Sequence, residues 1–215
     1  QFHGKIKAVA YVWSGGMEGG NAVVDVLSGK ETPSGKLPDT IAENLEDYPS
    51  ADNFGNPLTN LYQEDIYVGY RYFETFAPEE VMFEFGYGIS YTSFDIETLS
   101  VEEDDEEIKI QVKVTNTGDK YSGKEVVQVY YSAPQGALGK PAKELCAYAK
   151  TEKLAPGKSQ TIDISVSIND MASYDDSNVT GHKSCYVLEA GDYVIYVGNS
   201  VRTVSYTHLT LPTIC

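Results

Sequence analysis

The sequence is poor in cysteine and has no long apolar run, and each shortage excludes a class of protein. Its three cysteines, Cys146, Cys185 and Cys215, are too few and too scattered for a disulfide framework, and none lies in a C-x-x-C pair. We therefore expect reduced thiols in a cytoplasmic protein. No apolar stretch approaches the roughly 20 residues that span a bilayer, so we expect no membrane partner.

Basic residues are also scarce. The 215 residues include 16 Lys and Arg against 32 Asp and Glu, which gives a formal net charge of −16. Such a chain repels phosphate backbones, so we expect no nucleic-acid partner. A hydrophobic content of 41% indicates a globular chain that can bury a core.

Motifs for metals and nucleotides are missing as well. His182-x-x-Cys185 has no second ligand pair at metal spacing, and the acidic run Glu102–Glu107 lacks the spacing of a calcium loop, so we expect a solvated turn there. The loop "SGGMEGG" at 14–20 has neither the Lys-Ser/Thr of a phosphate loop nor the G-x-G-x-x-G spacing, and Glu18 would repel a pyrophosphate. We expect no metal ion and no cofactor.

The first 38 residues predict the end of an α/β domain. Residues 6–13, "IKAVAYVW", form an apolar run that is typical of a buried strand in a parallel sheet. A helix is predicted over Asn21–Ser28, with Gly29 at its C-terminal end. The chain opens without an initiator Met or a signal core, so we expect the domain to begin before residue 1. The apolar face of the predicted helix consists of Ala22, Val23, Val26 and Leu27.

Residues 39–93 predict a linker that packs between domains. Residues 39–65 show little periodicity, and a loop of that length is usually functional or wraps another domain. Ile66, Val68, Tyr70 and Tyr72 then alternate with the period of a strand. The many Tyr and Phe side chains of this region could stack on sugar rings or on Arg71. Aromatics at this density more often join domains through buried area, so we favour packing.

Residues 94–203 predict an immunoglobulin-like β-sandwich. Seven short runs alternate apolar and polar residues and are separated by turn signals such as "NTGDKYSG" and "LAPGKS". The fold class is thus α/β plus all-β. Tyr130 and Tyr131 are adjacent, so they should point to opposite faces and form no sugar-binding row. The predicted strands cover 94–101, 108–116, 124–132, 145–154, 160–168, 185–190 and 192–198.

The tail 204–215, "VSYTHLTLPTIC", follows the point near Val204 where the last strand is expected to end. Its codons from Val204 to Thr213 are compatible with a sequencing-library adapter read in one frame. We interpret 204–215 as a non-native tail and exclude His208 and Cys215 from functional reasoning. The alternative is a native edge strand.

Candidate site residues are few. Trp13 and Met17 lie at the carboxyl end of the first predicted strand, where open α/β sheets place ligands. Trp13 could line a sugar site or close the hydrophobic end of the sheet. Glu18 could act as an acid or base, or could simply favour the positive end of the helix dipole. No G-x-S-x-G elbow is present, and glycoside hydrolysis needs only two carboxylates, which the sequence alone does not select.

Several motifs together carry a family resemblance. "GGMEGGNAVVDVLSGKETPSGKLPDTI", "EDIYVGYRYFETF" and "FEFGYGISYTSF" resemble glycoside hydrolase family 3, in particular bacterial β-glucosidases. "VTNTGDKYSGKEVVQVYYSAP", "GKPAKEL" and "LAPGKSQTIDISV" resemble the fibronectin type III-like domain that ends many of these enzymes. The motifs fall in the family's order over about residues 6–203.

The resemblance implies the C-terminal end of an α/β sandwich domain followed by an immunoglobulin/fibronectin III-like β-sandwich. It further implies a retaining β-glucosidase that acts on terminal β-glucosyl residues of oligosaccharides or glycosides. The family's Asp nucleophile and Glu acid/base would lie before residue 1, so this chain holds no catalytic residue and should be inactive alone. A β-xylosidase and a non-catalytic carbohydrate-binding module stay open as alternatives. The oligomeric state is also open, a homo-oligomer included.

Overall fold

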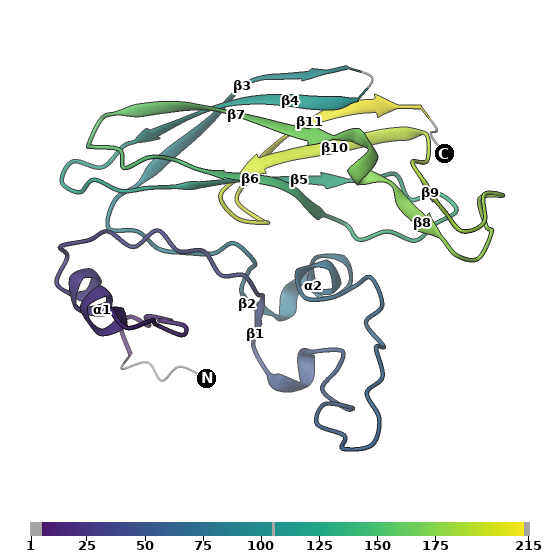
Figure 1. Ribbon diagram of the computed structural model, residues 1–215, viewed down its shortest axis with the longest axis horizontal. Helices are drawn as coiled ribbons and strands as arrows, with labels where there is room; N and C mark the ends of the chain where they lie inside the picture. Colours follow the sequence, from purple (N-terminus) through teal and green to yellow (C-terminus); the bar gives the residue numbers. More distant parts are fainter. Residues whose placement is uncertain (1–5, 105, 213–215) are drawn as a thin grey trace.

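The computed structural model describes residues 6–104 and 106–212. Residues 94–211 form two antiparallel sheets, the strand unit, and residues 6–93, the N-terminal part, lie along one side of it (Figure 1). The chain is thus mostly β-strand with few helices. One sheet has the order β3-β4-β7, with β3 at Phe94–Glu103, β4 at Glu107–Asn116 and β7 at Ser159–Ser167. The other has the order β11-β10-β5-β6, with β5 at Val126–Ser132, β6 at Glu144–Lys150, β10 at Gly191–Gly198 and β11 at Val204–Leu211.

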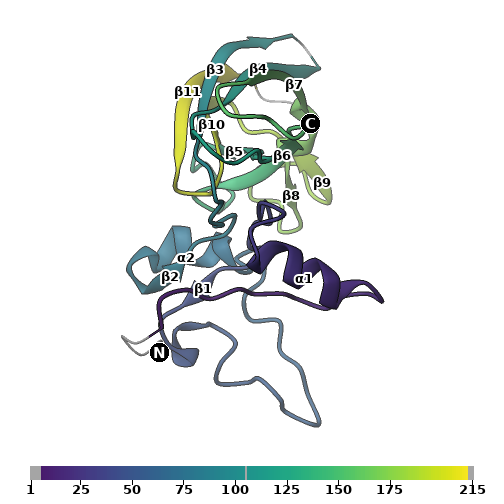
Figure 2. The same cartoon turned by 90° about the vertical axis from the view of Figure 1, so that its left-hand side faces the viewer.

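The two sheets bury one apolar core between them (Figure 2). Strand β4 shows why the sequence folds this way, because its side chains alternate between the core and water. Its outward positions carry Lys109, Gln111 and Lys113. The inward residues of β4 are Ile108, Ile110, Val112 and Val114, and β10 adds Tyr193, Ile195 and Val197 from the opposite sheet.

All but one of the predicted strands lie in these two sheets. The exception is the run 185–190, whose strand β9 (Cys185–Val187) pairs with β8 (Ser173–Asp175) in a separate hairpin. A 3₁₀-helix, η3 (Ile168–Met171), precedes this hairpin. The alternation therefore correctly predicts a strand at 185–187, but this strand pairs with β8 and not with the two larger sheets.

The prediction that the last strand ends near Val204 is wrong. Strand β11 runs antiparallel to β10 over its whole length, from the pair Gly198 and Val204 to the pair Gly191 and Leu211. Residues 207, 209 and 211 face inward, Leu209 packs against the core, and Leu211 is only 5% exposed. The edge of β10 offers unpaired backbone groups, and an alternating segment satisfies them. The adapter origin of 204–215 stays a prediction, and residues 213–215, with Cys215, lie outside the described residues.

The N-terminal part confirms the helix but not the strand. Helix α1 spans Gly19–Leu27, and Gly29 (φ 77°) follows in the left-handed conformation that ends a helix. Residues 6–13 form no strand, and no described strand lies beside them. A buried parallel strand exists only between neighbours that satisfy its backbone, and the described residues supply none.

Residues 66–72 are not a strand either, because helix α2 spans Tyr70–Phe76. Phe73 and Ala77 lie four residues apart on one face of the helix and join Ala42 in a small core. Tyr70 and Glu74, also four residues apart, lie on the same broad side of the helix and contact the strand unit. The period of two in the sequence is overridden by this helical packing. The remaining elements here are β1 (Ile41–Ala42), η1 (Leu45–Asp47), η2 (Pro78–Glu80) and β2 (Val81–Phe83), with β1 and β2 paired.

Candidate functional site

The three candidate site residues lie on one exposed loop before α1. Trp13 is exposed, has a φ of 56° and packs its ring edge-on against Tyr11, with ring centroids 4.9 Å apart. Met17 is fully exposed. The carboxylate of Glu18, the residue before the helix, accepts a hydrogen bond from the Asn21 side chain at 2.5 Å. Their role in substrate binding stays a prediction.

Some of the Tyr and Phe side chains of residues 39–93 pack between the N-terminal part and the strand unit. Tyr70 of α2 and Phe85 lie with ring centroids 4.6 Å apart, and Tyr130 of β5 meets both at 6.1 and 6.5 Å. Tyr130 is completely buried against the N-terminal part, whereas the neighbouring Tyr131 points the other way, into the core of the strand unit. These contacts confirm the prediction of packing at this place and of opposite faces for the two tyrosines. Burial raises the pKa of both phenols, so both stay protonated at neutral pH.

Ion pairs and hydrogen bonds surround this aromatic contact. Arg71 pairs with Glu144 of β6 at 3.3 Å. Arg202 pairs with Glu74 at 2.8 Å and also donates to the Pro78 carbonyl at 2.7 Å. These contacts join α2 to strand β6 and to the loop between β10 and β11. The sequence reading missed them because they depend on the helical period of residues 70–76, which the Tyr70–Glu74 spacing could have indicated.

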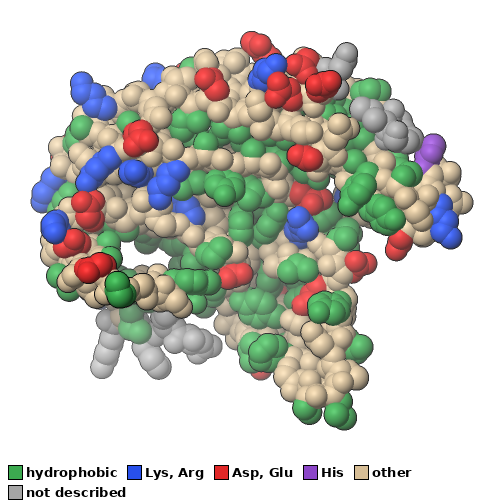
Figure 3. All heavy atoms as spheres, viewed as in Figure 1, with side chains coloured by type: hydrophobic (Ala, Val, Ile, Leu, Met, Phe, Trp, Pro, Cys, Tyr) green, Lys and Arg blue, Asp and Glu red, His purple; other side chains and the backbone are tan. Residues whose placement is uncertain are grey.

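A second set of contacts joins the first 38 residues to the strand unit. Lys36 and Glu125 form a largely buried ion pair at 2.8 Å. The Lys150 ammonium of β6 donates to the Ser34 carbonyl at 2.9 Å. Figure 3 shows the same face of the molecule as Figure 1 with all heavy atoms drawn, and apolar side chains gather on its lower surface. The N-terminal part thus contacts the strand unit at two places, around residues 34–36 and at helix α2.

The acidic run forms the exposed turn that the sequence predicts. Asp104 accepts the backbone N–H groups of Glu106 and Glu107, both at 2.9 Å, and pairs with Lys109. These N–H groups and the Lys109 ammonium lower the pKa of Asp104 to about 2. Its carboxylate is therefore occupied in closing the β3–β4 turn.

The Cys185 thiol donates to the His182 carbonyl at 2.8 Å, so this pair closes a turn. Residues 6–104 and 106–212 contain no grouping of three His, Cys, Asp or Glu side chains that could hold a metal ion. Over the same ranges, no helix is long and apolar enough to cross a membrane.

Comparison with known proteins identifies both parts of the chain. Residues 1–91 match the glycosyl hydrolase family 3 C-terminal domain, and residues 125–201 match the fibronectin type III-like domain. The chain is 53% identical over 196 residues to a β-glucosidase of Ruminococcus albus, covering 91% of this chain and 20% of that protein. It is 50% identical over 216 residues to β-glucosidase A of Butyrivibrio fibrisolvens, covering 92% of this chain and 26% of that protein.

Solved structures agree. A β-glucosidase from Paenibacillus barengoltzii superposes with a TM-score of 0.90 at 57% identity, over 93% of this chain and 23% of that one. β-Glucosidase 3B from Thermotoga neapolitana, in complex with glucose, superposes with a TM-score of 0.84 at 42% identity, over 94% of this chain and 28% of that one. The chain therefore spans about a quarter of the length of such relatives. With both domain families matched in order, this chain belongs to glycoside hydrolase family 3.

Proposed function

We propose that this chain is the C-terminal part of a retaining β-glucosidase that removes terminal β-glucosyl residues from oligosaccharides or glycosides. The observation that carries the proposal is the likeness to β-glucosidases over more than nine tenths of this chain but only a fifth to a quarter of the relatives. These relatives favour neither a β-xylosidase nor a free-standing carbohydrate-binding module. The catalytic pair would be supplied by the remaining length of the enzyme.

The exposed N-terminal segment supports a missing neighbour. Residues 6–13 have the composition of a buried parallel strand but lie in water. A contiguous apolar patch of this kind marks an interaction site in a soluble protein. We infer that further strands of an α/β sandwich domain cover it, that 39–93 link this domain to the next, and that 94–203 form a fibronectin type III-like sandwich. The exposed apolar side chains are Ile6, Val9, Tyr11, Val12 and Trp13.

The carboxylates of this chain support catalysis elsewhere. A retaining glycosidase needs a nucleophile and a protonated acid about 5–5.5 Å apart. Four well-buried carboxylates among the described residues are already engaged: Glu74 with Arg202, Glu125 with Lys36, Glu189 with Lys140, and Asp175 with the N–H groups of its own loop. The Thr180 hydroxyl lowers the pKa of Asp175, and, although burial opposes it, the Lys140 ammonium lowers the pKa of Glu189, so both carboxyls stay ionised, which is unsuited to a general acid. Trp13, Met17 and Glu18 would lie near the sugar cleft at most.

The thiols support a reducing compartment. Cys146 and Cys185 are free, and burial raises the pKa of the Cys146 thiol to about 12. Cys146 is therefore protonated and unreactive, and its Sγ–H donates to the Val129 carbonyl at 3.3 Å. We propose a cytoplasmic enzyme on this basis.

Expression of the complete open reading frame tests the proposed function. We expect the frame to continue upstream of Gln1, and its purified product to hydrolyse 4-nitrophenyl β-D-glucoside with retention of configuration. The β-D-xyloside serves as the competing substrate, and we expect a lower kcat/KM for it. A frame that starts at Gln1, or a product that prefers the xyloside, would contradict the proposal.

A further inference from the structure

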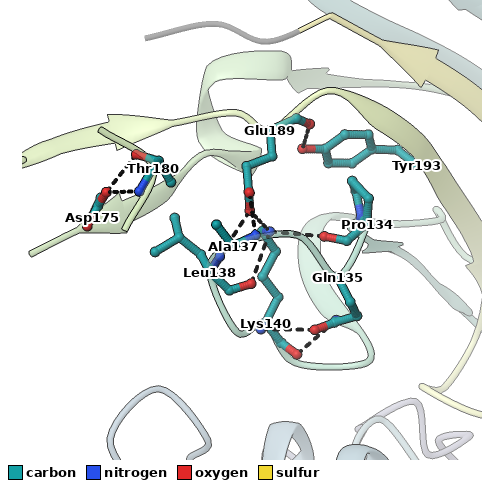
Figure 4. Close-up of polar contacts among 9 residues, drawn as sticks. All are labelled: Pro134, Gln135, Ala137, Leu138, Lys140, Asp175, Thr180, Glu189 and Tyr193. Carbon is teal, nitrogen blue, oxygen red and sulfur yellow. Dashed lines mark hydrogen bonds and ion pairs between the residues drawn. The ribbon is translucent and has the colours of Figure 1, made fainter. Parts of the chain in front are cut away.

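One buried ion pair shapes the loop that joins β5 to β6 (Figure 4). Lys140 is only 3% exposed, and its ammonium contacts the carboxylate of Glu189. The same ammonium donates to the backbone carbonyls of Pro134 at 2.9 Å and Leu138 at 3.3 Å. Since an ammonium has three protons, these three acceptors use its full donor capacity.

Glu189 is equally committed to this loop. Its Oε1 accepts the Ala137 N–H at 2.7 Å, and its Oε2 accepts the Leu138 N–H at 3.3 Å. Burial alone would raise the pKa of Glu189, but the Lys140 bond and these N–H groups lower it overall, so the carboxylate stays charged. Gly136 lies so close that a Cβ there would meet the carboxylate at 2.3 Å. The loop is therefore wound around the ion pair.

The Gln135 side chain closes the loop a second time. Its amide donates to the Lys140 carbonyl at 3.1 Å, and its oxygen accepts the Lys140 N–H at 3.3 Å. Glu189 itself lies two residues before β10, and its carbonyl accepts the Tyr193 hydroxyl at 3.0 Å. The loop is thus fixed to the start of β10. Because desolvation makes a buried ion pair weak evidence for stability, a role in geometry is the better explanation of this cluster.

The residues that follow Lys140 are those that contact the N-terminal part. The Ala142 N–H donates to the Thr75 hydroxyl at 2.9 Å, and the Leu145 N–H donates to the Tyr70 hydroxyl at 2.8 Å. Both hydroxyls belong to helix α2. Leu145 is held in place by β6, whereas the Ala142 donor lies in the loop and reaches Thr75 only if the loop holds a fixed path.

Two side-chain contacts lie in the same short stretch. Glu144 pairs with Arg71 at 3.3 Å. A Cβ on Gly139 would come within 3.3 Å of the Tyr67 hydroxyl, which shows how closely the loop approaches residue 67. Residues 139–145 therefore form a docking segment that begins at the ion pair.

We propose that the Lys140–Glu189 ion pair is the positioning element that docks the strand unit on helix α2. The pair fixes the path of residues 134–140, and this path brings the loop part of the docking segment to Tyr67 and Thr75, next to Glu144 and Leu145 of β6, which contact Arg71 and Tyr70. The core between the two sheets does not depend on it. Loss of the pair should therefore uncouple α2 while the sheets stay folded.

Amide hydrogen exchange of the 215-residue chain, read by mass spectrometry, tests this role. In Lys140→Met we expect exchange in residues 70–77 to rise roughly tenfold or more, because the Thr75 and Tyr70 hydrogen bonds open. Exchange in β4 should stay unchanged. The matched control is Lys109→Met, which removes an exposed ion pair on β4 and should leave residues 70–77 unaffected.

The other possible results of the exchange experiment also support or contradict the proposal. If Lys140→Met raises exchange only within 134–141, the ion pair stabilises only its own loop and the proposal is wrong. If β4 also loses protection, Glu189→Gln decides, because it removes the charge and keeps one oxygen that can accept the Ala137 N–H. Increased exchange confined to 134–145 and 70–77 in Glu189→Gln supports the proposal. Loss of protection in β4 in both variants overturns it, since the pair then supports the whole fold.

Discussion

Replacing Tyr130 with alanine is expected to lower the free energy of unfolding by about 3–5 kcal/mol. The side chain is completely buried at the meeting point of the two parts, where its ring contacts Tyr70 and Phe85. Truncation leaves a cavity against two aromatic rings and removes the hydrogen bond from the hydroxyl to the Gln128 side chain. Urea denaturation followed by circular dichroism measures the loss.

Two matched variants separate the ring from the hydroxyl. Tyr130→Phe keeps the packing and loses one hydrogen bond, so we expect a loss of about 1 kcal/mol. Tyr206→Ala removes an exposed tyrosine from β11 and should change the stability by less than about 0.5 kcal/mol. An equal loss for Tyr130→Phe and Tyr130→Ala would show that the aromatic contact contributes nothing, against the packing described here.

Removal of residues 204–215 is expected to make the protein aggregate. β11 covers the edge of β10 over the whole length of that strand, and Leu209 and Leu211 pack against the core. Burial of Leu211 contributes about 1.5–3 kcal/mol and the partly buried Leu209 adds to it, and the exposed edge of β10 becomes a template for pairing with other chains. The soluble fraction and the size-exclusion profile of a chain that ends at Thr203 measure the effect.

The substitution Leu211→Ala is the control for this truncation. It keeps the β10–β11 backbone ladder and leaves a cavity at one inward position, so we expect a destabilised but monomeric protein, with a loss of about 2–5 kcal/mol. If the truncated chain is monomeric and as stable as the parent, β11 contributes nothing and the strand is an addition of no structural consequence. That result would agree with an adapter origin for these residues.

The sheets could be predicted from the sequence because their signal is local. In β4 each apolar residue alternates with a charged or polar one, and the same holds in β7 and most of β3. Helix α1 was also predictable, since Gly29 marks its end. The elements that were missed depend on distant neighbours. Residues 6–13 lack strand partners, α2 takes its helical period from packing against both the small core and the strand unit, and β11 forms because β10 has a free edge.

The candidate site shows a similar division. The motifs around the glycine loop and at 64–76 indicate the family, and the comparisons confirm it. The geometry of the loop is less informative, since Trp13, Met17 and Glu18 are all exposed in the segment before α1. A substrate cleft is built from several chain segments, and a sequence covering a fifth to a quarter of its relatives carries only some of them.

The proposal that the catalytic residues lie in other parts of the enzyme is tested most directly by the hydrolysis of 4-nitrophenyl β-D-glucoside with the purified 215-residue chain. With the nucleophile and the acid supplied by other parts of the enzyme, we predict a rate equal to that of buffer at every protein concentration. Release of nitrophenol in proportion to the amount of chain, with the activity co-eluting with the chain in size-exclusion chromatography, would contradict it.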